Sequence, residues 1–158
     1  MEASGVTTPR RRNRSNPRRR LFTLEHASRT LPLVKRIIAD IVRQYKRVCA
    51  LEEKCHMRRP NVSTEEQETL RKSYTIELGR LRELAQELSA VGCELKDWRS
   101  GLVDFRSMHE GREVELCWRL GEEKIEYWHE ISNGFDGRQP IEENFGSPRP
   151  AEPAGSAS

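Results

Sequence analysis

Two long stretches of this chain repeat apolar side chains every three or four residues, and this spacing constrains the fold more than any other feature. The first stretch covers residues 34–48 and the second covers residues 70–91. Side chains at this spacing fall on one face of an α-helix. Between them, residues 58–61 (Arg-Arg-Pro-Asn) are typical of a helix end, and Ser63 with Glu66 forms a capping box. The sequence therefore predicts a long antiparallel helical hairpin.

The ends of the hairpin also carry recognisable signals. Thr23 is a predicted N-cap, and Gly92 is the expected stop of the second helix. Because proline breaks a helix interior, Pro32 predicts a short helix to about Arg29 and then a kink or a fresh start at Thr30. The apolar residues of the second helix lie close to heptad spacing, which is typical of a coiled coil.

After Gly92 the apolar period changes from about 3.6 to two. One alternating set ends at Leu120 and another begins at Ile125, which predicts a β-hairpin with a turn of two or four residues around Gly121-Glu122. Residues 101–105 have the composition of a third strand. The predicted fold class is α+β: a long antiparallel helical hairpin followed by a small antiparallel β-sheet, made of a β-hairpin plus one strand.

The two ends of the chain have a different composition from its middle. Residues 1–20 hold seven arginines, one glutamate and almost nothing apolar, so we expect a flexible arm. Residues 142–158 are rich in proline and small side chains and predict a disordered tail. The domain is therefore expected at residues 21–141. No stretch is apolar enough for a membrane span, and a cytoplasmic protein with reduced thiols at Cys49, Cys55, Cys93 and Cys117 is expected.

Five residues after Gly92 have the side-chain types of a cation site: Asp97, Asp104, Glu115, His129 and Glu130. Of these, Asp97, Asp104 and His129 would offer two carboxylates and an imidazole to a divalent metal ion. Against this, a histidine within a strand is more often a packed residue that donates a ring proton to a carbonyl or carboxylate. We therefore favour no metal and predict no cofactor, and we keep these three residues as candidates.

A cysteine nucleophile is a further alternative. Cys117 would need a base, and His129 is the obvious one. The predicted strand alternation sends Cys117 and His129 to opposite faces of the sheet, which argues against the pair. A structural thiol is the expectation for Cys117.

Basic and aromatic side chains near the end of the predicted domain suggest an anionic ligand. The loop 134–137 is flanked by glycines and precedes Arg138, an arrangement that can approach an anion. Alternatively, Arg138 pairs with Asp97 or Asp104 and fixes the C-terminal segment to the sheet. The candidate binding residues are Lys96, Asp97, Asp104, Arg119, Trp128, His129 and Arg138.

Several short motifs in the same region resemble one known family. They are Leu95-Lys96-Asp97, Gly101-Leu102-Val103-Asp104-Phe105, Gly111-Arg112-Glu113-Val114, Leu116-Cys117-Trp118-Arg119-Leu120-Gly121-Glu122, Trp128-His129 and Gly134-Phe135-Asp136-Gly137-Arg138-Gln139-Pro140. With the opening Phe22-Thr23-Leu24-Glu25, they resemble the bacterial domain of unknown function 2203 family over residues 22–141. The resemblance implies a bacterial cytoplasmic protein and supplies no activity or catalytic residue.

Three functions follow from these observations. The leading one is a non-enzymatic binding or assembly protein that forms a homo-oligomer. The predicted hairpin is too long for the small sheet to cover all of its apolar stripe, in particular Ile41, Tyr45, Leu78 and Leu81. The second is an enzyme with a metal or anion site at Asp97, Asp104 and His129. The third is a nucleic-acid accessory protein whose basic arm binds polyanions weakly and without sequence preference.

Overall fold

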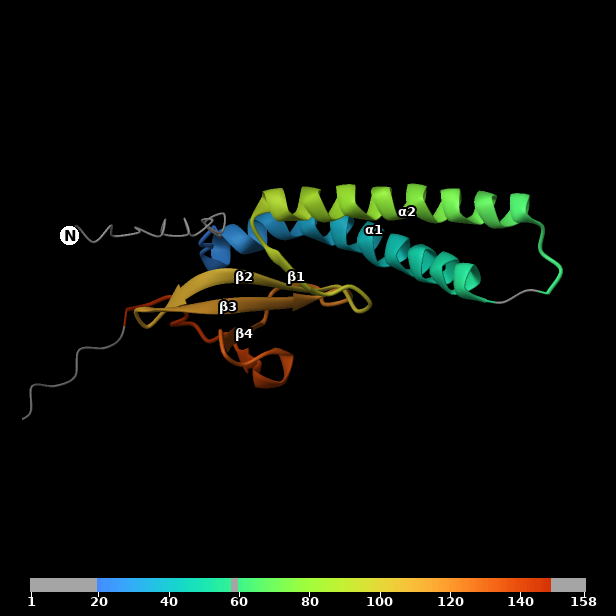
Figure 1. Ribbon diagram of the computed structural model, residues 1–158. Helices are drawn as coiled ribbons and strands as arrows, with labels where there is room; N and C mark the ends of the chain where they lie inside the picture. The colour runs from blue at the N-terminus through green and yellow to red at the C-terminus, as the bar shows by residue number, and fades with distance from the viewer. Residues whose placement is uncertain (1–19, 58–59, 149–158) are drawn as a thin grey trace, which may run out of the picture.

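The computed structural model describes residues 20–57 and 60–148 and contains a helical hairpin followed by a five-stranded antiparallel sheet (Figure 1). The helices are α1 (Leu24–His56) and α2 (Thr64–Val91). The strands are β1 (Glu94–Asp97), β2 (Leu102–His109), β3 (Arg112–Arg119), β4 (Tyr127–Glu130) and β5 (Gln139–Pro140), with a short 3-10 helix, η1 (Phe135–Gly137), before β5. The predicted α+β class is confirmed.

The predicted arginine-rich arm lies outside the described residues except for Arg20, and so do residues 149–158 of the predicted tail. Within residues 20–57 and 60–148, we find no helix with enough length and apolar character to cross a bilayer. The predicted polyanion-binding role of the arm therefore remains an expectation from sequence.

The predicted helix caps are confirmed. The side chain of Thr23 accepts a hydrogen bond from the backbone N–H of His26 at 3.1 Å. Ser63 and Glu66 form the reciprocal capping box of α2. Gly92 ends α2 with φ 104°, a left-handed conformation that glycine adopts without strain.

The predicted end of a short helix near Arg29, with a fresh start at Thr30, is wrong, because α1 runs through Pro32 from Leu24 to His56. A proline in a helix interior removes one backbone hydrogen bond and costs roughly 3 kcal/mol. Here Ala27, Leu31 and Val34 on both sides of the proline are buried in the core. Burial of each large apolar side chain contributes roughly 1.5–3 kcal/mol, which is enough to keep the helix continuous.

The sheet has one apolar face, which packs against the base of the hairpin. Its register pairs Val103 with Trp118, Phe105 with Leu116, and Leu116 with Trp128. These residues share the hydrophobic core with the buried face of α1, and Phe105 meets Phe22 edge to face at 5.2 Å. In Figure 1 the far end of the hairpin projects beyond the sheet, so the sheet covers only its base.

The predicted turn between β3 and β4 is wrong, and the two strands pair one residue out of the predicted register. Cys117 pairs with Tyr127 and Leu116 pairs with Trp128, so the connection is the longer segment 120–126. In this connection Trp118 Nε1 donates to the carbonyl of Glu122 at 3.0 Å, and Ile125 is buried outside any strand. A slip of one residue in the pairing moves every side chain of the strand to the opposite face of the sheet. Trp128 therefore joins the core, and His129 points to the opposite face.

The sheet is larger than the predicted three strands. β2 continues to His109 and turns into β3 at Glu110-Gly111, where both residues have positive φ (48° and 77°), as in the tight turns that suit a β-hairpin. β1 and β5 extend the sheet at its two edges. Beyond Ile141, Phe145 stacks on His109 with ring centroids 4.8 Å apart.

Candidate functional site

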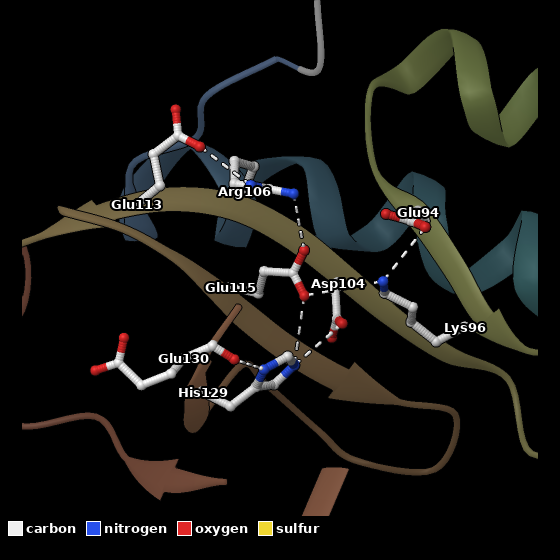
Figure 2. A network of polar contacts seen from close by, with 8 residues as sticks. All are labelled: Glu94, Lys96, Asp104, Arg106, Glu113, Glu115, His129 and Glu130. Carbon is white, nitrogen blue, oxygen red and sulfur yellow. Dashed lines mark hydrogen bonds and ion pairs between the residues drawn. The ribbon is translucent and has the colours of Figure 1, made fainter. Parts of the chain in front are cut away.

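The face of the sheet turned away from the apolar core carries a cluster of buried polar side chains (Figure 2). Strand alternation and register place Asp104 of β2, Glu115 and Cys117 of β3, and His129 of β4 on this face. Their relative exposures are 3%, 3%, 0% and 2%. Groups of this polarity are costly to bury unless they bind one another, protons or ions.

His129 is the centre of the cluster. Its Nδ1 lies 2.7 Å from the backbone carbonyl of Glu130, and its Nε2 lies 3.0 Å from Oδ2 of Asp104 and 3.7 Å from Oε2 of Glu115. Since a carbonyl only accepts hydrogen bonds, Nδ1 carries a hydrogen. The short contact between Nε2 and Asp104 then requires a second proton, or a cation, between them.

Glu115 lies at the basic side of the cluster. Its Oε1 is 3.3 Å from a guanidinium nitrogen of Arg106, and its Oε2 is 4.0 Å from Nζ of Lys96 (Figure 2). Burial raises the pKa of Glu115, and the neighbouring Asp104 carboxyl raises it further, while Lys96 and Arg106 oppose both effects. Arg106 also pairs with Glu113 at 3.0 Å, which fixes the guanidinium over this face.

Cys117 is part of the same cluster, so the prediction that Cys117 and His129 lie on opposite faces is wrong. The sulfur of Cys117, the Nε2 or Nδ1 of His129 and a carboxylate oxygen of Asp104 all lie within 4.8 Å of one another. Burial raises the pKa of the Cys117 thiol to about 12, with the Asp104 carboxylate adding to the effect. Without a cation the group is a neutral thiol, which is a poor nucleophile.

Arg138 has a structural partner different from both predicted ones. It pairs with both carboxylate oxygens of Glu122, at 2.6 and 2.7 Å, instead of with Asp97 or Asp104. Its guanidinium lies over the rings of Tyr127 and Phe135, with distances to the centroids of 4.3 and 4.7 Å. These contacts fix the segment that contains η1 to the sheet. Arg119 lies 5.0 Å from the centroid of Phe135, in the same layer.

The structure separates the remaining candidates. Asp97 accepts hydrogen bonds from the backbone of Arg99 and Ser100, at 3.3 and 3.1 Å, and so holds the turn before β2. The Ser100 hydroxyl, which bonds the same carboxylate, is the main cause of the lowered pKa of Asp97. Trp128 belongs to the core face, where it meets His109.

Of the predicted binding residues, Asp104 and His129 converge directly, and Lys96 reaches them through Glu115. Sequence reasoning counted Glu115 among the possible cation ligands but left it out of the candidate site, missed Arg106 and dismissed Cys117. The available signal was that Glu115 and Cys117 alternate with core residues on the same strand. Only the register of β4 shows that His129 faces them.

A second feature lies at the base of the hairpin. An apolar groove of about 500 Å³ opens between the two helices and the turn after β1, and it is lined by Tyr45, Leu78, Leu81, Arg82, Ala85, Gln86, Ser89 and Trp98. Ile41 and Leu81, which the predicted exposed stripe included, are only 0% and 6% exposed because the hairpin packs on itself. The apolar stripe available to a partner is therefore narrower than predicted.

In fold and site, this is an α+β protein with a helical hairpin, a five-stranded antiparallel sheet and a buried polar cluster on the outer face of that sheet. Residues 20–141 match the family described as Uncharacterized conserved protein (DUF2203), and the chain belongs to this family. The resemblance predicted from the sequence motifs is thereby confirmed. No curated protein and no solved structure matches the chain.

Proposed function

We propose that this protein is a non-enzymatic binding protein that assembles as a homodimer through the groove at the base of its helical hairpin. The observation that carries the proposal is the apolar groove itself, which spans α1, α2 and the turn after β1. Apolar surface gathered in one concave place marks a contact with a partner. The described cysteines are free thiols, which fits a reducing cytoplasm.

The burial of the polar cluster favours binding over catalysis. Asp104, Glu115, Cys117 and His129 are almost inaccessible to solvent, and an enzyme must bring its titratable groups into contact with a substrate. The groove, in contrast, is open. The residues that line it include no carboxylate, histidine or cysteine, and their polar groups are those of Tyr45, Arg82, Gln86, Ser89 and Trp98.

The apolar stripe of α2 is incompletely covered within one chain. Only Leu81 and Leu88 of this helix are buried, although its apolar residues continue at helical spacing along its length. Tyr74, Leu78 and Leu84 remain half-buried at the edge of the core. A second apolar surface laid along this side would remove them from water and gain roughly 25 cal/mol per Å².

A second copy of the chain is the occupant that the groove fits best. Ala85 and Ser89 are one helical turn apart and have small side chains, so a second helix can approach α2 closely there. In the proposed dimer, the larger side chains of Tyr45 and Leu78 in one copy form the ridge that packs into the groove of the other copy. Two hairpins related by a two-fold axis would form a four-helix arrangement. Two-fold symmetry is the commonest symmetry of soluble oligomers.

The test is the molar mass of the full chain in solution, measured by size-exclusion chromatography with light scattering at micromolar concentration. The wild-type chain is expected to be a dimer. Ala85→Arg places a charge in the groove and is expected to give a folded monomer. The matched control is Ile76→Arg, which changes an apolar residue that is 58% exposed on α2 and does not line the groove.

Circular dichroism of both variants separates loss of assembly from loss of folding. A wild-type monomer, or a dimer that survives Ala85→Arg as well as Ile76→Arg does, would contradict the proposal. A dimer broken equally by both variants would place the interface elsewhere on α2.

A further inference from the structure

We propose that Asp104, Cys117 and His129 form a binding site for one divalent first-row transition metal ion of the zinc class, within the outer face of the sheet. The three residues come from three adjacent strands, β2, β3 and β4. The site is independent of the groove on the hairpin, and its test does not depend on dimerisation.

The geometry brings three donor atoms of the right types together. The ligand atoms of Asp104, Cys117 and His129 lie within 4.8 Å of one another. Zinc binds sulfur at about 2.3 Å and nitrogen or oxygen at about 2.0–2.2 Å, which puts tetrahedral donors roughly 3.3–3.8 Å apart. Small rotations of these side chains on paired strands suffice to reach that spacing.

His129 is oriented as a metal ligand. Its Nδ1–H donates to the carbonyl of Glu130 at 2.7 Å, which leaves the lone pair of Nε2 directed at Asp104. A metal-bound histidine commonly donates its other ring hydrogen in this way, because the bond fixes the tautomer and the ring plane. A metal ion would also replace the extra proton that the 3.0 Å contact between Nε2 and Oδ2 otherwise requires.

Asp104 supplies an independent observation that points to a missing partner. Its side chain is 3% exposed, and within the described residues its Oδ1 is fully buried and accepts no hydrogen bond. A buried carboxylate oxygen without a partner destabilises the fold, because it has lost its hydrogen bonds to water and gained none in return. Coordination of a cation would satisfy this oxygen.

Charge and ligand softness decide which ion fits. Two anionic ligands, the Cys117 thiolate and the Asp104 carboxylate, would neutralise a dication in this buried place, and His129 would bind as the neutral base. The metal would displace the thiol proton of Cys117 to solvent. A thiolate and an imidazole favour zinc, cobalt or ferrous iron over magnesium and calcium, which prefer oxygen ligands. Glu115, held by Arg106, lies beside the ligand set at 3.7 Å from Nε2.

The ion would serve the structure of the sheet. The three ligands are at most 3% exposed, so a bound ion has no open side towards a substrate. It would tie β2 to β4 across β3 and so stabilise the sheet.

The experiment uses the full chain, unfolded with a chelator and refolded without metal. Cobalt is the probe, because Co²⁺ bound to a thiolate shows a charge-transfer absorption band, whereas Zn²⁺ bound to the same ligand does not. We expect one equivalent of Co²⁺ per chain, both on refolding with the ion and on titration of the folded chain, and displacement by Zn²⁺ but not by Mg²⁺. The thermal midpoint of the wild-type chain should rise with Zn²⁺, because the ion binds the folded state.

Cys117→Ser is expected to abolish the charge-transfer band and the rise in thermal midpoint. The matched control is Cys93→Ser, which changes another buried thiol that lies at the end of α2 and should keep both signals. Asp104→Asn and His129→Gln should weaken Co²⁺ binding by more than the roughly 10–100-fold seen for residues that only orient a ligand. If Cys117→Ser fails to fold, Co²⁺ binding by these two variants tests the proposed site instead.

Two results would overturn the proposal. One is a wild-type chain that takes up no stoichiometric Co²⁺ or Zn²⁺ under either loading condition. The other is a charge-transfer band that persists in folded Cys117→Ser, or that disappears in Cys93→Ser, because the thiolate ligand would then be a different cysteine.

Discussion

Nε2 of His129 lies 3.0 Å from Oδ2 of Asp104, although β4 and β2, which carry these residues, are separated by β3. The two side chains reach across β3 on its polar face, where Glu115 and Cys117 also point. The contact therefore couples two strands that share no backbone hydrogen bonds. Both residues are at least nine-tenths buried, so solvent screens the pair little.

The first prediction concerns the stability of this pair in the metal-free chain. His129→Ala and Asp104→Ala should each lower the free energy of unfolding by about 1–3 kcal/mol, because each leaves a buried polar partner unsatisfied. The double variant should cost less than the sum, with a coupling energy of about 0.5–3 kcal/mol. Urea unfolding with a chelator present measures the free energy of unfolding of the wild-type chain, the two single variants and the double variant. Strictly additive costs would show that the two residues do not interact.

The second prediction compares two glycines. Gly101 has φ +70°, and a Cβ there would lie 2.7 Å from Cγ2 of Ile38 and 2.9 Å from Cβ of Leu120. Gly101→Ala should therefore destabilise the chain by at least about 1–3 kcal/mol. Gly79 lies inside α2, and a Cβ there meets nothing within 4 Å. Gly79→Ala should stabilise the chain by about 0.5–1 kcal/mol. Equal effects of both substitutions in thermal unfolding would contradict the packing at Gly101.

The third prediction concerns Arg138. Arg138→Lys keeps the charge but loses the two-point pairing with Glu122 and the stacking on Tyr127 and Phe135, so it should cost about 1–3 kcal/mol. Arg119→Lys is the control, since Arg119 is exposed and should change stability by less than about 0.5 kcal/mol. Limited proteolysis of Arg138→Lys should cut faster between Asn133 and Gln139. A variant as resistant and stable as wild type would show that Arg138 does not hold this segment.

The fourth prediction is a pH dependence. Burial raises the pKa of the Cys93 thiol from 9.0 to about 12. The folded chain thus holds this proton more tightly than the unfolded chain. The stability associated with it is fully present below pH 9 and is lost as pH rises from about 9 to 12.

The slope from this one group is at most about 1.4 kcal/mol per pH unit. Cys93→Ala removes that slope, so the difference in unfolding free energy between wild type and variant should change through this window and be constant below it. Chemical unfolding at a series of pH values measures the difference. A difference that is independent of pH from 8 to 11 would mean that Cys93 titrates normally in the folded chain.

Local signals in the sequence predicted the helical half of the fold well. The caps at Thr23, Ser63 and Gly92 depend on the chemistry of neighbouring residues, and each one lies where the sequence places it. Pro32 shows the limit of such signals. Its local preference for breaking a helix is weaker than the burial of Leu31 and Val34 against the core, which is a tertiary effect.

The candidate site was only partly predictable for the same reason. The sequence determined that Asp104, Cys117 and His129 lie on strands and alternate with core residues. The predicted face of the sheet for His129 was wrong, because that face depends on the register of β4 against β3. The loop 120–126 contains Glu122, which pairs with Arg138, and Ile125, which is buried in the core, so its conformation depends on residues far from the turn. Strand periodicity is a local property, whereas the pairing of strands is decided by the packing of the whole sheet, and only the tertiary structure places the thiol, the imidazole and the carboxylate together.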